Sequence, residues 1–160
     1  MKTLITPQQA MRLAFGADEP LPPGIIGEAD IAAAEARWIV PALGRRLHAK
    51  LLTGAHLEFR NEYLAAPLAL YTRALIQPRL DVRTDRNGTT KPAPADAQPA
   101  DAAARCELRR QLLRQGRTLL LRATDYLDEY AALYPEYEPG TGPAARCSLE
   151  SGIVLPARTR

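Results

Sequence analysis

The stretch Ala100–Leu133 reads ADAAARCELRRQLLRQGRTLLLRATDYLDEYAAL and decides the fold class. It is dominated by Ala, Leu and Arg, which are strong helix formers. Apolar residues recur in it at helical spacing, at Leu108, Leu112, Leu119, Ala123, Tyr126 and Tyr130. A helix over the whole stretch would be roughly 50 Å long, too long to be buried fully against so small a protein. We therefore expect part of it to project or to meet a partner.

Charge is segregated along this predicted helix. The first part is basic, with Arg105, Arg109, Arg110, Arg114, Arg117 and Arg122, and the end is acidic, with Asp125, Asp128 and Glu129. This polarity opposes the helix dipole, which favours cations at the C-terminus. One interpretation is an ordinary solvated face. The other is that the basic part of one subunit meets the acidic part of its neighbour, a head-to-tail contact that builds a ring when the rotation closes.

Shorter helices are predicted before this stretch. Thr6-Pro7 indicates the start of a helix that ends near Phe15, because Thr caps helix N-termini and Pro is tolerated at the first position. Apolar spacing predicts further helices over 26–40, 41–53 and about 57–78, with Pro41 and Pro67 as points of kinking or restart. The expected fold is all-α, a bundle of about five helices with a long C-terminal helix and an extended tail.

Two segments interrupt the helical pattern. We expect residues 1–134 to form a single helical domain that contains a flexible loop at 84–99, where Asn87-Gly88 is a turn signal and prolines favour extended backbone. This loop is either disordered in the isolated chain or ordered on assembly. Residues 135–160, rich in Pro and Gly, are expected to form an extended C-terminal tail. Its apolar patch is a candidate docking element and consists of Ile153, Val154 and Leu155.

Composition narrows the class of protein. The 160 residues carry a net charge of +3, milder than a dedicated nucleic-acid binder shows, although contact with DNA is not excluded. Cys106 and Cys147 form no CxxC pair, so we expect two reduced thiols, with a disulfide between helix and tail as the alternative.

Pro7 and Arg12 break any signal-peptide core, and no stretch has the roughly 18 apolar residues of a membrane span. We expect a protein that is neither secreted by a signal peptide nor bound to a membrane.

The sequence contains no motif that indicates catalysis or metal binding. His48 and His56 stand in none of the metal-binding spacings, and phosphate-binding and nucleophile motifs are missing from the sequence. Cys106 lies among arginines, which can lower a thiol pKa, but it has no adjacent His or second Cys. We therefore expect no catalytic residue, no cofactor and no metal site. A helix-turn-helix in the first 53 residues is disfavoured because Glu28 and Asp30 would meet DNA phosphates.

The N-terminal third resembles the head–tail connector (adaptor) proteins of tailed phages and prophages. The matching stretches are Thr3-Leu4-Ile5-Thr6-Pro7, the Ala-rich segment 29–39 that ends in Trp38-Ile39, and the turn at Leu43-Gly44. The full chain is also similar to uncharacterised prophage proteins of Bacteroidetes. In those proteins a stretch like YTRALIQPRLDVRT, a polar loop, a long Arg-rich helix and a Cys-Ser tail with Gly-Ile-Val recur.

The resemblance implies a structural protein of a phage or prophage particle. Connectors form ring homo-oligomers between the portal and tail proteins, around a channel through which DNA passes. Arginines on the channel wall would contact DNA phosphates without recognising the base sequence. The candidates for this wall, or for subunit contacts, are Arg105, Arg109, Arg110, Arg114 and Arg117. The candidates for the acidic partner face are Asp125, Asp128 and Glu129. The resemblance places the protein in the virion or the bacterial cytoplasm.

Two other classes compete with the connector. One is a helical regulator or adaptor that binds another bacterial protein as a monomer or dimer. The other, less favoured, is a small DNA-binding regulator, which would bind random duplex DNA in a salt-sensitive way. An enzyme is the least favoured class, because no residue pair is arranged for acid–base or nucleophilic work.

Overall fold

The structure, a computed structural model, describes residues 2–16, 24–80, 83–85, 88–90 and 100–138. Within these ranges the regular secondary structure is helical apart from one short hairpin. The chain forms five helical segments, 7–14, 28–43, 45–52, 57–80 and 102–129, the last of which is the longest. The predicted all-α bundle of about five helices with a long C-terminal helix is confirmed. Most of the predicted tail lies outside the described residues, which end at 138.

Several helical segments are composite. Helix α1 spans Pro7–Ala14, and α2 (Glu28–Ala34) continues through a π-helical turn, Glu35–Ile39, into α3 (Val40–Leu43). After α4 (Arg45–Leu52), the short α5 (Leu57–Phe59) continues through a second π-helical turn, Arg60–Leu64, into α6 (Ala65–Leu80). Strands β1 (Arg83–Asp85) and β2 (Gly88–Thr90) precede α7 (Ala102–Glu129), which is followed by a 3₁₀ turn, Ala131–Leu133.

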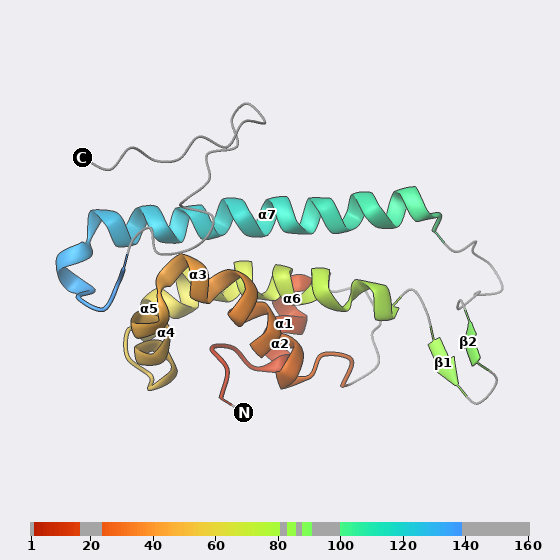
Figure 1. The fold of residues 1–160 in the computed structure, drawn as a ribbon, viewed down its shortest axis with the longest axis horizontal. Coiled ribbons are helices and arrows are strands. Elements are labelled where there is room, and N and C mark those ends of the chain that lie inside the picture. Colours follow the sequence, from red (N-terminus) through yellow and green to blue (C-terminus); the bar gives the residue numbers. More distant parts are fainter. Residues whose placement is uncertain (1, 17–23, 81–82, 86–87, 91–99, 139–160) are drawn as a thin grey trace.

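Helix α6 lies at the centre of the bundle. Helices α1 and α2 pack against it, and α7 lies along it on another side and runs in the opposite direction (Figure 1). A helix that is apolar all round must be covered all round. Accordingly, α6 buries residues on every side, namely Ala65, Pro67, Leu68, Ala69, Tyr71, Thr72, Ala74, Ile76 and Gln77.

The start of α1 is a capping box. The backbone N–H of Gln9 donates to Thr6 Oγ1 at 3.2 Å, and the backbone N–H of Thr6 donates to Gln9 Oε1 at 2.9 Å. With Pro7 at the first position, this is the helix start that Thr6-Pro7 predicts. The cap satisfies two backbone donors that a helix leaves without internal partners.

Replacing Thr6 with alanine is expected to cost about 1 kcal/mol of the free energy of unfolding, because Gln9 N–H loses its acceptor. Urea unfolding, followed by circular dichroism, measures the change. Thr6→Ser keeps the hydroxyl and serves as the matched control, with most of the stability retained. An equal loss in both variants would show that the hydroxyl is not the stabilising group.

Pro41, predicted as a point of kinking or restart, is the second residue of α3, which directly follows the π-helical turn Glu35–Ile39. Pro41 lies inside the continuous helix 28–43, and the break comes at Gly44, whose φ of +84° favours glycine. Pro67 likewise lies inside 57–80 and neither ends nor restarts that helix. A π-helical turn ends two residues before Pro41 and three residues before Pro67. The wider turn makes room for a ring that would clash with the carbonyl four residues earlier in a regular α-helix.

The predicted loop 84–99 is partly strand. Strands β1 and β2 pair antiparallel, with Arg83 opposite Thr90 and Asp85 opposite Gly88. Gly88 of the predicted Asn87-Gly88 turn is the first residue of β2. Residues 86–87 and 91–99 of this segment lie outside the described residues. The prediction that the loop is disordered or ordered on assembly therefore stays a prediction.

A buried carboxylate ties the N-terminal segment to two helices. Glu35 is only 3% exposed, although its place in the sequence suggests a solvated residue. Its Oε1 accepts from the backbone N–H of Leu4 at 2.6 Å, and its Oε2 lies 2.9 Å from His48 Nε2. Because a buried charge is costly without partners, these contacts fix α2, α4 and residues 3–5 relative to one another.

Candidate assembly surface on helix α7

Helix α7 begins at an N-cap residue, Asp101, and lies within the stretch predicted to be helical. Asp101 accepts a hydrogen bond from the backbone N–H of Ala104 at 2.7 Å, and the helix then runs for 28 residues to Glu129. The predicted helix 100–133 is therefore correct to within a few residues, with Ala131–Leu133 as a 3₁₀ turn. At 1.5 Å per residue, α7 is about 42 Å long.

The inner face of α7 is a stripe that begins only at its eleventh residue. Its buried residues lie three or four apart and are Leu112, Gly116, Leu120, Ala123 and Leu127. The predicted stripe is partly wrong. Leu112 and Ala123 are buried, but Leu108, Leu119 and Tyr126 are only partly buried and Tyr130 is 41% exposed. The predicted stripe differs from the buried one because it was drawn through leucine and aromatic residues. The buried stripe instead includes Gly116, which has no side chain and allows close contact with α6.

Gly116 is a point of close approach between α7 and α6. A Cβ at this position would lie 2.9 Å from Tyr71 Cε1, closer than carbon atoms pack. The Tyr71 ring stacks in turn on Trp38, with ring centroids 4.7 Å apart and planes within 7°. Burial raises the pKa of Tyr71 to about 12, against the opposing charge of Arg117. The outward side of α7 is thus held at a set distance from the bundle.

An aromatic cluster holds the other end of α7. Tyr126 stacks on Tyr63 with centroids 4.5 Å apart and on Phe59 at 5.7 Å, and Tyr134 packs against Phe59 at 5.3 Å. Burial and a hydrogen bond with Tyr126 raise the pKa of Tyr134 to about 12. Offset and tilted ring pairs of this kind add to the energy of burial. The C-terminal part of α7 is therefore fixed on the α5–α6 segment.

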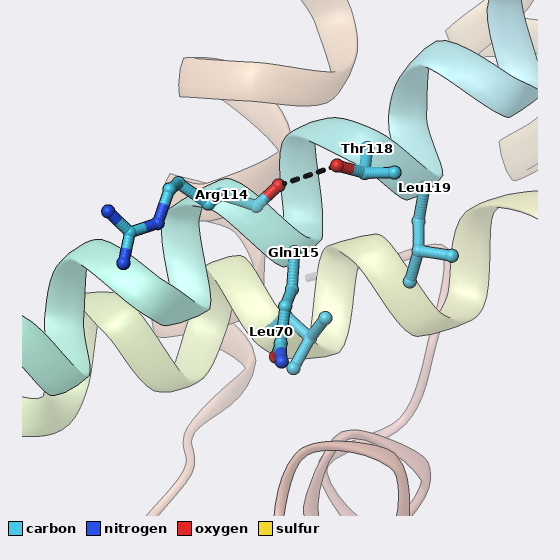
Figure 2. A pocket seen from close by; sticks show the side chains of 5 residues that line it. All are labelled: Leu70, Arg114, Gln115, Thr118 and Leu119. Atoms are coloured by element: carbon cyan, nitrogen blue, oxygen red, sulfur yellow. Dashed lines mark hydrogen bonds between the residues drawn. The ribbon is translucent and has the colours of Figure 1, made fainter.

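The outer face of α7 carries a charge gradient. Six residues spaced three or four apart are exposed on one stripe, and they are Arg110, Arg114, Arg117, Leu121, Asp125 and Asp128. We call this stripe the outer stripe. Leu121, near its middle, is 52% exposed. Figure 2 shows the Arg114 side chain directed away from Leu70 of α6.

The five arginines predicted as contacts do not form one patch. Arg110, Arg114 and Arg117 belong to the outer stripe, whereas Arg105 and Arg109 continue the line of the buried stripe beyond Leu112, by the 3.6-residue period. Arg114 binds Glu107 at 2.5 Å and Arg110 approaches the same carboxylate at 3.7 Å. The hydrogen bond and charge of Arg114 lower the pKa of Glu107.

The predicted acidic face also divides. Asp125 and Asp128 lie on the outer stripe, while Glu129 lies on a different side of α7 and interacts with Tyr130. Burial raises the pKa of Tyr137 to about 12, and the hydrogen-bonded carboxylate of Asp128 adds to this shift. Beyond the helix, Glu136 and Glu138 approach Lys50 and Arg46, each at 3.5 Å. The predicted docking patch Ile153, Val154 and Leu155 lies outside the described residues.

Other features of the described residues do not assemble a reaction site. A shallow groove beside α7 is lined by Leu70, Arg114, Gln115, Thr118 and Leu119, and it holds no acid–base pair (Figure 2). Glu35 and His48 bind each other inside the bundle. Cys106 is an exposed free thiol. In the described part of the chain, His, Cys, Asp and Glu form no group of three or more that could hold a metal ion.

Sequence reasoning missed three residues that shape this surface. These are Glu35, Gly116 and Leu121, to which the sequence pattern gave no role. A glycine within a long predicted helix is a usable signal, because it costs stability unless packing demands it. Glu35 offered no comparable signal, because its partners Leu4 and His48 are distant in the sequence.

Comparison with known proteins gives one family match. Residues 40–146 match the model of DUF6712, a family of unknown function, and this span exceeds half of the 160-residue chain. It contains the α5–α6 segment and all of α7. Neither a curated protein nor a solved structure matches the chain significantly. Within the described residues, none of the helices has the length and apolar character that crossing a membrane requires.

Proposed function

Because the chain belongs to the DUF6712 family, whose function is unknown, its role must be inferred from its surfaces, and we propose that it is a structural assembly protein rather than an enzyme. The observation that carries this proposal is the outer stripe of α7. A 28-residue helix is held rigidly on the bundle by Gly116 and the aromatic cluster, yet it leaves an ordered row of charges exposed. Such a row suits recognition of another protein surface.

Within this class we propose a head–tail connector, a ring-forming protein between portal and tail of a phage or prophage particle. Support comes from the resemblance of the segments 3–7, 29–39 and 43–44 to connector proteins. The basic half of α7 supports it further, because arginines on a ring's inner wall would meet DNA phosphates without reading bases. The protein would then occur in the virion, or in the bacterial cytoplasm before assembly.

The two groups of arginines allow these roles to be separated. Arg110, Arg114 and Arg117 share their stripe with acidic residues, which would repel phosphate, and are better suited to protein contact. Arg105 and Arg109 lie at the end of α7 that extends beyond the buried stripe, with acidic residues of the outer stripe far along the helix. We assign Arg105 and Arg109 to the channel wall in the connector.

The connector proposal predicts a large closed oligomer on the portal. Light scattering of the purified protein, mixed with a phage portal protein, should give a complex with about ten or more copies of this chain, because a head-to-tail contact closes into a ring. The portal alone and this protein alone are the controls. A chain that ignores the portal at every concentration would contradict the connector and favour the adaptor of another bacterial protein.

A further inference from the structure

The outer stripe has an internal symmetry. Its central residue is Leu121; Arg117 and Asp125 stand four residues before and after it, and Arg114 and Asp128 stand seven before and after it. All five residues are exposed, and the opposite side of α7 is buried against the bundle. Reversing the helix about Leu121 therefore places each of these four charges where its opposite stood, whereas Arg110 falls at residue 132, which is Ala.

We propose that the outer stripe binds the outer stripe of a second copy of this chain, antiparallel, about a twofold axis at Leu121. In this pair Arg117 faces Asp125 of the partner subunit and Arg114 faces Asp128 of the partner subunit. The twofold axis repeats both contacts, so four ion pairs flank one central leucine pair. Contacts of this isologous kind are the commonest in homo-oligomers.

The charges select the antiparallel direction. Two parallel copies in register would place Arg114 against Arg114 and Asp128 against Asp128, which is unfavourable. The 4-3-4-4-3 spacing from Arg110 to Asp128 averages 3.6 residues, the period of a straight α-helix, so the outer stripe follows one side of α7 along its length. Thr118 and Thr124 flank Leu121, and their small side chains allow the helices to approach closely.

The pairing is expected to be weak and sensitive to salt. Exposed ion pairs contribute little individually and are screened at high ionic strength. Leu121 supplies the principal apolar contact of the stripe, and a single helix pair lies at the small end of specific interfaces. Arg114 already binds Glu107, but its guanidinium has further N–H donors to offer Asp128 of the partner subunit.

This inference does not rest on the connector. An isologous contact closes after two copies, so a ring would need a second, head-to-tail surface as well. The two proposals therefore fail separately. Loss of the dimer with portal binding retained would leave the connector standing, and a dimer that ignores the portal would leave the α7 pair standing.

A charge exchange tests the pairing directly. The double variants Arg114→Glu/Arg117→Glu and Asp125→Arg/Asp128→Arg should each be monomeric in sedimentation velocity at concentrations where the unchanged protein is dimeric, with at least a tenfold weaker self-association. Mixed in equal amounts they should form a heterodimer, because every facing pair is again of opposite sign. The matched control Arg12→Glu/Arg45→Glu lowers the net charge as much as Arg114→Glu/Arg117→Glu does, at exposed positions off the stripe, and should dimerise normally.

Crosslinking tests the position of the axis. In a Cys106→Ser/Cys147→Ser background, Leu121→Cys places two thiols at the axis, where antiparallel helices about 8–10 Å apart bring them within disulfide reach. Mild oxidation should then give a covalent dimer. Arg122→Cys, about 100° further around the helix, should not. An unchanged protein that stays monomeric at low salt and high concentration, or equal crosslinking at 121 and 122, would overturn the proposal.

Discussion

Replacing Glu35 with alanine is expected to lower the free energy of unfolding by about 3 kcal/mol. The loss has two physical sources. The buried backbone N–H of Leu4 would lose its acceptor, and His48 would lose the carboxylate that lies 2.9 Å from its Nε2. A buried donor without a partner costs far more than the net gain from an average hydrogen bond. Guanidinium unfolding at neutral pH measures the change.

Two further variants separate these sources. Glu35→Gln keeps an amide oxygen that can accept from Leu4 N–H, so it should lose less stability than Glu35→Ala. Glu58→Ala removes an exposed carboxylate and should change the free energy of unfolding by less than about 0.5 kcal/mol. If Glu35→Ala were no more damaging than Glu58→Ala, the buried contacts would not be stabilising the fold.

Replacing Gly116 with valine is expected to cost about 3 kcal/mol, through forced separation of α6 and α7. Even the first carbon of the new side chain would lie 2.9 Å from the Tyr71 ring. That ring is held by stacking on Trp38 and is only 3% exposed, so it has little freedom to move aside. Thermal unfolding should show a single transition at a clearly lower temperature.

The control for this change is chosen to keep the chemistry constant. Gln111→Val introduces the same side chain into an exposed position of α7, where only a small loss of helix propensity is expected. Removing the obstructing ring gives a second check. In a Tyr71→Ala background the further cost of Gly116→Val should fall below about 1 kcal/mol, because contacting residues couple. An undiminished cost there would mean that the clash is not with Tyr71.

Local patterns in the sequence were enough for the helices themselves. Thr6-Pro7 marked the start of α1, and the Leu- and Ala-rich stretch 100–133 marked α7 to within a few residues. Both signals are local, because capping and helix propensity depend on residues a few positions apart. Prolines were the weak point. Pro41 and Pro67 indicated a kink or a restart, but the sequence did not indicate the π-helical turn that precedes each of them.

The faces of the helices were harder to predict. Counting apolar residues on α7 gave a stripe that included the exposed Tyr130 and omitted Gly116. A glycine has no side chain to count, yet it allows close contact between α7 and α6. When the buried face of a helix is assigned wrongly, its exposed face is assigned wrongly as well. For this reason the five arginines were predicted as one group, although they lie on two sides of α7.

By itself, the sequence determined that this protein is helical, where its long helix runs and that the charge of this helix changes sign along its length. Only the tertiary structure decided which side of α7 is covered, that Glu35 is buried against Leu4 and His48, and that Leu121 stands exposed between arginines and aspartates. The physical reason is one of range. Helix formation depends on neighbouring residues, whereas burial depends on contacts between residues far apart in the chain, such as Gly116 with Tyr71.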